Sequence, residues 1–357
     1  MKDDTVKKGP MSRIDQRPRG RARRPAARME DVAREAGVSL MTVSRALHQP
    51  DLVSKKAHAR ISDAMSTLGY VRDLTAQALA SQSSRMIGVV VPTLLNPVFS
   101  EAVEGLSDGL ESEGYQLLVA SSGFSLRQEE RAVETILGRR PDSVIVTGQL
   151  HSRHTRQRLL KSGVPIYEMG NVDADPLDTA VGASNSEAAH ELALHLLRLG
   201  YRNIAYIGGH KEDNDRAISR EKGFLDALAA HGLEMDPNKV VRCNPVLYGE
   251  GLDALEHLLT TFPEIDAVFC SVEVLAIGAL CLCQRRGIKV PDQLAIVCFD
   301  SGELSSLMSP PLTRILLPRY ELGRSIAEDF LNRRNMDSPL GPRVINLGYR
   351  LIEGGSA

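Results

Sequence analysis

The sequence predicts a small N-terminal unit made only of helices, followed by a larger α/β domain that is divided into two lobes. Up to about residue 68, apolar residues recur at the spacing of amphipathic helices. From Met86 onward, continuous β-branched runs of strand length alternate with helical stretches. Such runs indicate parallel strands that are covered on both faces. About ten runs are too many for one compact sheet, so we expect two sheets in two lobes.

Composition and periodicity divide the chain into a tail, a helical headpiece, a hinge helix with its linker, and the two-lobed domain. We place these segments at residues 1–27, 28–74, 75–85 and 86–357. The tail is expected to be disordered, because it combines Arg, Pro, Lys and Gly with almost no apolar periodicity.

Three short helices are predicted in the headpiece. They cover Met29–Ala36, Leu40–Leu47 and Lys55–Leu68. Gly37 and Gly69 directly follow the first and third of these stretches and favour helix termination. Ser39 precedes the second stretch and is expected to cap it.

Strands and helices are predicted to alternate through the α/β domain. The strands are Met86–Val91, Gln116–Ser121, Ser143–Thr147, Val164–Met169, Asn203–Gly208, Lys239–Arg242, Ala267–Ser271 and Leu294–Asp300. The helices are Phe99–Glu113, Arg127–Leu137, Thr155–Ser162, Glu187–Leu199, Arg220–His231, Gly249–Thr260 and Ala276–Arg286. Ligands of such sheets bind beyond the carboxyl ends of the strands, so we expect a binding cleft between the lobes.

Charge is unevenly distributed along the chain. The formal net charge is −2, yet residues 1–85 contain 17 Lys and Arg against 9 Asp and Glu. The remaining residues contain 26 against 36. A basic first quarter on an acidic body is typical of a nucleic-acid-binding region, and a solubilising basic tail produces the same balance. Charge alone therefore leaves both alternatives open.

The sequence is expected to belong to a cytoplasmic protein without a membrane partner. No apolar stretch approaches the roughly 18–20 residues that cross a bilayer. The basic N-terminus contains no apolar core of a secretory signal. The five cysteines fall within or beside apolar segments, which indicates reduced thiols rather than a disulfide framework.

The stretch Met29–Leu47 contains the strongest functional signal. Ala33 and Val43 are small enough to let two helices cross closely, and Gly37 permits a sharp turn between them. The opposite face of the second helix presents Leu40, Met41, Thr42, Ser44 and Arg45. These short groups and one guanidinium can approach phosphates and base edges in a major groove. A helical hairpin without a DNA role is the alternative.

This stretch resembles the helix-turn-helix headpiece of the lactose/galactose-repressor (LacI/GalR-type) family of transcription regulators. The similarity extends over residues 28–357, through Gly69-Tyr70, Ile87–Pro92, Asn96–Phe99, Leu199–Ala205, Val290–Asp292, Phe299–Ser301 and Ser309–Thr313. The resemblance implies a two-lobed domain like that of periplasmic binding proteins. It also implies a homodimer in which each headpiece reads half of a near-palindromic operator in double-stranded DNA.

The resemblance further implies which headpiece residues contact DNA. Leu40, Met41 and Arg45 match the base-reading positions of the recognition helix, and Ser39, Thr42 and Ser44 match phosphate-binding or capping positions. Two apolar residues at base-reading positions favour contacts with thymine methyl groups and recognition of DNA shape. Arg28 departs from the capping Thr of the family, which leaves the start of the first helix open.

Thr75–Ala80 matches the hinge helix of the family, and Leu79 matches the leucine that wedges into the minor groove. A helix this short is unstable alone, so it is expected to fold only on DNA. A plain interdomain linker is the alternative.

For a small-molecule effector, the resemblance implies contacts from Phe99, Thr147, Arg220 and Asp300. An Arg can bind a carboxylate or hydroxyls bidentately, and an Asp suits sugar hydroxyls. Val272 replaces a usual polar residue, so one familiar contact is missing. For each of these residues, a helix cap or a buried ion pair is the alternative.

Within the family, the chain resembles gluconate-operon repressors in particular. The similarity lies in Met41–Arg45, Ala180–Gly182, Leu317–Arg319, Asn346–Tyr349 and Gly354–Ser356. The resemblance implies a sugar-acid effector such as gluconate or a ketogluconate. No leucine heptads follow residue 350, so the tetramer-forming tail of some relatives is not expected.

No metal, cofactor or catalytic site is predicted. His151 and His154 are spaced like metal ligands but lie at a helix start among three arginines. Cys281 and Cys283 fall on different faces of an apolar helix. Two other classes of function compete with a repressor: a sugar-binding receptor without a DNA role, and an enzyme on the same scaffold. The basic headpiece disfavours the receptor, and the lack of a recognisable acid/base or nucleophile constellation disfavours the enzyme.

Overall fold

The computed structural model describes residues 27–71, 83–299, 302–334 and 341–357. The chain divides into two compact units, Met1–Ala76 and Gln77–Ala357. The predicted hinge helix Thr75–Ala80 with Leu79, the predicted effector residue Asp300, and all but the last residue of the predicted tail lie outside the described residues. Among the helices that the described ranges contain, none is both long and apolar enough to span a membrane.

Residues 27–71 fold into three α-helices around a small core. They are α1 (Met29–Ala36), α2 (Leu40–His48) and α3 (Lys55–Leu68), with a 3-10 turn at Pro50–Leu52. The buried side chains that join them are Val32, Ala33, Ala36, Val43, Ala46, Ile61 and Ala64. The predicted helix boundaries are confirmed to within one residue.

The turn between α1 and α2 requires a glycine at position 37. Gly37 has a φ of 60°, and a Cβ there would meet the Arg60 guanidinium at 2.4 Å. The predicted cap is also confirmed, because the Ser39 hydroxyl accepts a hydrogen bond from the Thr42 amide at 3.1 Å. At the start of α1, Asp31 accepts a hydrogen bond from the backbone N–H of Arg28 at 3.0 Å. The helix therefore begins without a capping Thr.

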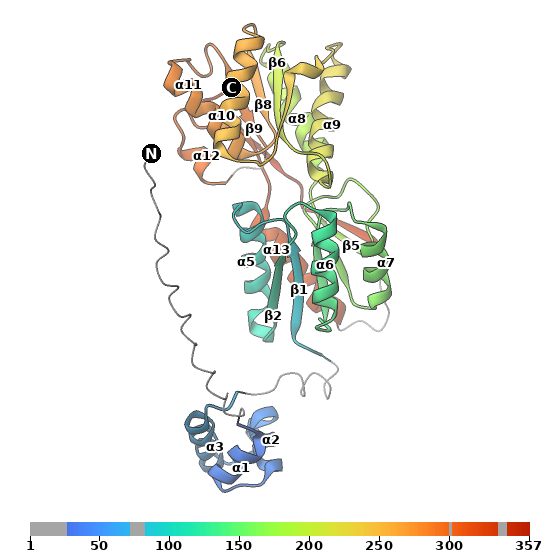
Figure 1. Ribbon diagram of the computed structural model, residues 1–357, viewed down its shortest axis with the longest axis vertical. Coiled ribbons are helices and arrows are strands. Elements are labelled where there is room, and N and C mark those ends of the chain that lie inside the picture. Colours follow the sequence, from blue (N-terminus) through green and yellow to red (C-terminus); the bar gives the residue numbers. More distant parts are fainter. Residues whose placement is uncertain (1–26, 72–82, 300–301, 335–340) are drawn as a thin grey trace, which may run out of the picture. The chain divides into compact units, whose positions relative to one another are not determined.

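The first lobe of the larger unit is built on a parallel sheet in the order β11-β5-β4-β3-β1-β2. Its strands are β1 (Met86–Val91), β2 (Gln116–Ser121), β3 (Ser143–Thr147), β4 (Ile166–Met169), β5 (Thr179–Gly182) and β11 (Arg343–Asn346). Helices α5 (Pro97–Leu110) and α13 (Arg319–Arg334) cover one face, and α6 (Leu126–Leu137) and α7 (Arg153–Ser162) cover the other (Figure 1).

The second lobe repeats this plan with a sheet in the order β12-β10-β9-β8-β6-β7. Its strands are β6 (Ile204–Gly209), β7 (Val240–Cys243), β8 (Ala267–Cys270), β9 (Ala295–Cys298), β10 (Thr313–Leu316) and β12 (Arg350–Ile352). Helices α8 (Asn185–Arg198) and α9 (Asp215–Ala230) cover one face, and α10 (Tyr248–Thr261) and α11 (Glu273–Arg286) cover the other. A short helix, α12 (Leu304–Leu307), lies between β9 and β10. The predicted two-lobed α/β architecture is thus confirmed.

The predicted strands and helices end at Asp300, and this end of the pattern was wrong. After β10 in the second sheet, α13 packs against α5 of the first lobe, β11 joins the first sheet, and β12 returns to the second (Figure 1). The β12 strand runs antiparallel to β10, which departs from the all-parallel expectation. Its pairing partner β10 is distant in the sequence, so strand direction there could not be inferred from local pattern.

Candidate functional site

The exposed face of α2 presents the side chains that the sequence analysis assigned to DNA bases. Leu40 and Met41 are apolar yet 43% and 63% exposed, and Arg45 is also exposed. Val43 and Ala46 face the core instead. The packing of α2 on α1 therefore leaves two apolar groups and one guanidinium outside, as entry into a major groove requires. Their contacts with bases stay predictions.

The N-terminus of α2 has the chemistry of an anion site. Ser39 and Thr42 are joined by a hydrogen bond of 2.8 Å between their hydroxyl oxygens, and the first turn of α2 contains no acidic residue. Unpaired N–H groups and the positive end of the helix dipole favour a phosphate at such a position. Ser44 lies half-buried on the same helix. Phosphate contacts by these residues stay predictions too.

The larger unit contains a cleft of about 1170 Å³ that residues of both lobes line. Ser121 and Thr147 end β2 and β3 of the first lobe, and Gly209 and Cys243 end β6 and β7 of the second. The cleft therefore lies at the carboxyl ends of the strands, where parallel sheets bind their ligands.

Phe99 and Thr147 were predicted to contact an effector, and both line this cleft. The Phe99 ring meets that of Phe124 edge to face, with 6.3 Å between ring centroids, and makes an apolar wall. The Thr147 hydroxyl donates a hydrogen bond to the Val90 carbonyl at 2.9 Å. The Thr147 hydroxyl proton is therefore already engaged in a hydrogen bond within the sheet. Towards a ligand, the Thr147 oxygen can act only as a hydrogen-bond acceptor.

Arg220, also predicted to contact an effector, lines the cleft and is 7% exposed. Its guanidinium carbon lies 4.2 Å from the centroid of the Phe299 ring. Nε donates to Asn185 Oδ1 at 2.8 Å, and Nη1 donates to the Ser271 carbonyl at 2.9 Å. These contacts fix the plane of the guanidinium, which prepares it to bind a polar ligand. The fourth predicted residue, Asp300, lies outside the described residues.

Helix α9 begins at Asp215 and not at Arg220, where the sequence analysis placed its start. The Asp215 carboxylate accepts hydrogen bonds from the Gln149 amide at 2.8 Å and from Asn171 Nδ2 at 3.0 Å, both in the first lobe. Burial raises the carboxyl pKa, but the adjacent Arg216 and these donors hold the pKa of Asp215 below its ordinary value. These two hydrogen bonds thus connect the start of α9, in the second lobe, to the first lobe beside the cleft.

Two further buried arginines, Arg216 and Arg319, line the cleft, and neither was predicted there. Arg319 is the first residue of α13, lines the cleft and is 5% exposed. Its Nη1 lies 3.5 Å from Glu101 Oε1 on α5. In the sequence alone, Leu317–Arg319 stands out only as part of the family resemblance. Its place in the cleft depends on the return of the chain to the first lobe, which no local pattern shows.

His151 is part of a buried ionic cluster in the first lobe. Its Nδ1 lies 2.8 Å from Glu129 Oε1, its Nε2 lies 3.3 Å from Glu168 Oε1, and the three side chains are at most 7% exposed. Burial lowers the pKa of His151, but the two carboxylates outweigh it and raise that pKa to about 9. His151 is therefore a buried core residue whose two carboxylate partners favour its protonated form, and its burial was not predicted.

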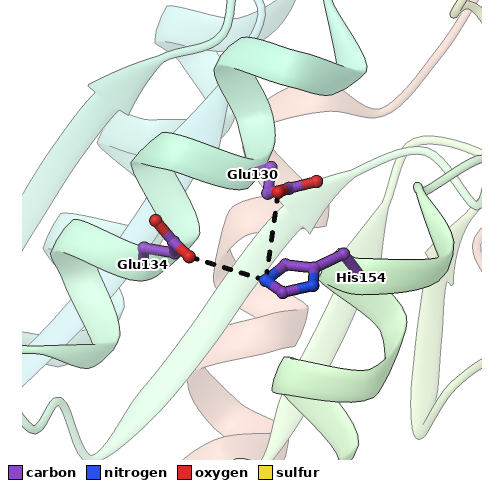
Figure 2. A group of neighbouring side chains, drawn as sticks. All are labelled: Glu130, Glu134 and His154. Atoms are coloured by element: carbon purple, nitrogen blue, oxygen red, sulfur yellow. Dashed lines mark ion pairs between the residues drawn. The ribbon is translucent and has the colours of Figure 1, made fainter.

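His154, the other histidine considered above, lies in a cluster with half-buried Glu130 and exposed Glu134 (Figure 2). Its Nε2 is 3.9 Å from Glu130 Oε1 and 3.5 Å from Glu134 Oε1. The Arg158 guanidinium contacts both Glu134, at 2.6 Å, and His154, at 2.6 Å. A cation of the protein itself thus already pairs with Glu134 and His154.

Comparisons with known proteins agree with this geometry. Residues 28–73 match the family described as bacterial regulatory proteins, lacI family, and residues 84–345 match periplasmic binding proteins and sugar binding domain of LacI family. The chain is 34% identical to the HTH-type transcriptional regulator GntR of Escherichia coli K12, over 92% of this chain and 98% of that protein. It is 30% identical to the HTH-type transcriptional regulator IdnR of the same strain, over 91% and 97%. A crystal structure of a LacI family transcriptional regulator from Silicibacter pomeroyi superposes with a TM-score of 0.86 and 30% identity, over 92% and 99%.

Proposed function

This chain belongs to the lacI family of bacterial regulatory proteins, and we propose that it is a homodimeric, cytoplasmic repressor whose affinity for its operator is controlled by a sugar acid. Membership of the family makes it a DNA-binding transcriptional regulator. The proposal adds the operator contacts, the dimer and the class of effector. Its main support is the presence, in one chain, of an exposed α2 surface suited to a major groove and a cleft with buried arginines.

In the proposed complex, α2 of each protomer lies in the major groove of one operator half-site. Leu40, Met41 and Arg45 contact base edges, while Ser39, Thr42 and Ser44 position the helix on phosphates. Leu79 of each protomer wedges into the minor groove between the half-sites. The headpiece of this proposal is residues 28–74, with residues 75–85 as hinge and linker.

Gluconate or a ketogluconate is the proposed effector. The resemblance to gluconate-operon repressors and the similarity to GntR support a sugar acid. The cleft supports it chemically, because the buried Arg220 guanidinium places positive charge beside ligand oxygens and the Phe99 wall can pack against carbon atoms. Asp300 would accept hydrogen bonds from ligand hydroxyls.

The test uses an operator selected from a random duplex library with the full-length protein. Fluorescence anisotropy then measures operator affinity with gluconate, with 2-ketogluconate and with the neutral polyol glucitol. We expect a sugar acid to change operator affinity and glucitol to leave it unchanged. Linkage requires operator DNA to change sugar-acid affinity by the same factor, which calorimetry measures.

The outcomes separate the parts of the proposal. Failure to select any duplex contradicts the proposed operator contacts of α2. Tight operator binding that ignores every sugar acid contradicts the effector part alone. Arg220→Ala should abolish the response while operator affinity stays near that of the wild type, and a normal response would place the effector elsewhere.

A further inference from the structure

The turn between β2 and α6 holds a phenylalanine in a backbone conformation that bulky residues rarely adopt. Gly123 and Phe124 have φ values of 58° and 57°, and the Ser125 N–H donates to the Ser122 carbonyl at 3.0 Å. Turns with positive φ at both central positions are dominated by Gly, Asn and Asp, and a bulky side chain there is strained. Folding alone therefore disfavours a phenylalanine at position 124, so its presence calls for a different reason.

The Phe124 ring is only partly covered by the protein. It lines the interlobe cleft and is 39% exposed, whereas the neighbouring Phe99 is 6% exposed. Their edge-to-face contact thus leaves Phe124 as the more accessible ring of the pair. A strained backbone and an exposed ring both cost free energy in the protein without ligand, and such strain is typical of binding sites. A ligand that packs against the ring accounts for both features.

The first lobe fixes the start of this turn. The Gly123 N–H donates to the Pro92 carbonyl at 2.9 Å, and the Ser121 hydroxyl donates to the same carbonyl at 2.8 Å. Pro92 directly follows β1, which pairs with β2 in the first sheet. The turn is therefore held at the carboxyl ends of two neighbouring strands, on the side of the cleft.

The second lobe holds the other end of the turn. Asp213, in the loop between β6 and α9, accepts a hydrogen bond through Oδ2 from the Leu126 N–H at 3.1 Å. Leu126 is the first residue of α6, so this carboxylate lies at the positive end of the helix dipole. Asp213 itself has a φ of 60°, a conformation that Asp tolerates. Because Leu126 lies two residues after Phe124, a contact between the lobes helps to set the position of the ring.

We infer that Phe124 is a specificity-determining residue of the cleft, whose ring packs against the carbon-bound hydrogens of the effector, and that Asp213 is the positioning residue that holds this ring from the second lobe. The inference rests on the proposed function and adds a contact for the carbon skeleton of the sugar acid. A ligand on Phe124 binds more tightly when Asp213 holds the turn. It therefore favours one arrangement of the lobes, as control of operator affinity requires.

The first test places a fluorescent reporter at the proposed contact. The chain contains no tryptophan, so Phe124→Trp introduces a single indole. Titration of the full-length variant with gluconate and with 2-ketogluconate should change the indole emission saturably. Phe262→Trp is the matched control, because Phe262 is half-buried, follows α10 and does not line the cleft. Its emission should not respond. Sugar-acid binding seen by calorimetry without an emission change in Phe124→Trp would overturn the inference.

The second test separates the ring from its support by calorimetry with the same two sugar acids. Phe124→Asn tolerates positive φ and removes the ring, so it should weaken binding by roughly 10- to 200-fold, the range for a lost apolar contact in a pocket. Phe124→Tyr keeps the ring and should recover most of this loss. Asp213→Gly keeps the backbone conformation and removes the acceptor, so it should cause a smaller loss. Asp213→Asn retains an acceptor and should recover it.

The double variant Phe124→Asn, Asp213→Gly tests whether Asp213 acts through the ring. Its affinity for sugar acids should equal that of Phe124→Asn alone, because without the ring the support has nothing left to position. Losses that add instead would make Asp213 an independent contact between the lobes and overturn its positioning role.

Two further outcomes separate this inference from the proposed function. If Phe124→Asn binds sugar acids as tightly as the wild type and operator affinity still responds to them, Phe124 does not contact the effector and the proposed function stands. If the wild type binds neither sugar acid and its operator affinity ignores both, the sugar-acid part of the proposed function fails together with the inference.

Discussion

The α2 surface and the interlobe cleft are built in opposite ways. All six described residues that we assign to DNA lie between Ser39 and Arg45, within two turns of one helix. The cleft instead gathers side chains from Pro92 to Leu347, which lie at strand ends, in loops and on helices of both lobes. The first surface needs only that one helix face be buried, whereas the second needs the whole topology. A change at one site should therefore affect one function and spare the other.

The largest expected effect comes from the buried cluster in the first lobe. Removing the imidazole by His151→Ala leaves Glu129 and Glu168 as buried carboxylates without their cation, which should cost about 3–5 kcal/mol of unfolding free energy. Because the chain contains no Trp, urea unfolding is followed by circular dichroism. Operator binding by the folded fraction should stay intact.

His154→Ala is the matched control for this prediction. His154 is 49% exposed, so its loss should cost no more than about 1 kcal/mol. Equal losses of unfolding free energy in the two variants would contradict a larger stabilising role for the buried cluster than for the exposed His154.

The same cluster predicts a pH dependence of stability. The folded pKa of His151, about 9, exceeds the unfolded value of about 6.5. Its stabilising contribution is therefore complete below about pH 6.5, and is lost as the pH rises to about 9, by about 3 kcal/mol. The difference in unfolding free energy between the wild type and His151→Gln should shrink over this window. A difference that stays constant from pH 6 to pH 10 would contradict a protonated His151.

A smaller effect is expected on the DNA side of the comparison. Arg45→Ala should weaken operator binding by about 1–3 kcal/mol, with a smaller loss on non-specific DNA. Gluconate affinity in the absence of DNA should not change, because Arg45 lies on α2 and the cleft lies in the other unit. Equal losses on operator and non-specific duplexes would identify Arg45 as a phosphate contact.

The smallest effect concerns the cap of the recognition helix. Ser39→Ala removes the hydroxyl that accepts from the Thr42 amide and should cost the headpiece about 0.5–2 kcal/mol. Ser39→Asp preserves an acceptor for the cap but adds negative charge at the proposed phosphate site. It should therefore keep headpiece stability and still weaken DNA binding, measured by unfolding and by anisotropy. An Asp variant that binds operator normally would argue against a phosphate at this helix terminus.

The sequence by itself determined the helices of the headpiece and the two-lobed α/β class. Apolar spacing, Gly37 and the Ser39 hydroxyl act within a few residues, so their effects on α1 and α2 are local and could be predicted. The continuous apolar runs likewise predicted strands whose sheets are covered by helices on both faces. Phe99, Thr147 and Arg220 were placed in the cleft by their resemblance to family positions, and not by local physics.

Only the tertiary structure decided the path of the chain after Asp300 and which charged side chains lie close together. Ile326, Ala327 and Phe330 are buried at helical spacing in α13, so that helix could have been found, but its packing on α5 of the other lobe could not. Arg319 and Glu101 are brought together across 218 residues of sequence. His151 follows β3 and Glu168 lies on β4, so these two side chains come together because β3 and β4 are neighbours in the first sheet. Such pairs depend on which strands become neighbours, and this depends on the burial of whole faces rather than on the residues beside each charge.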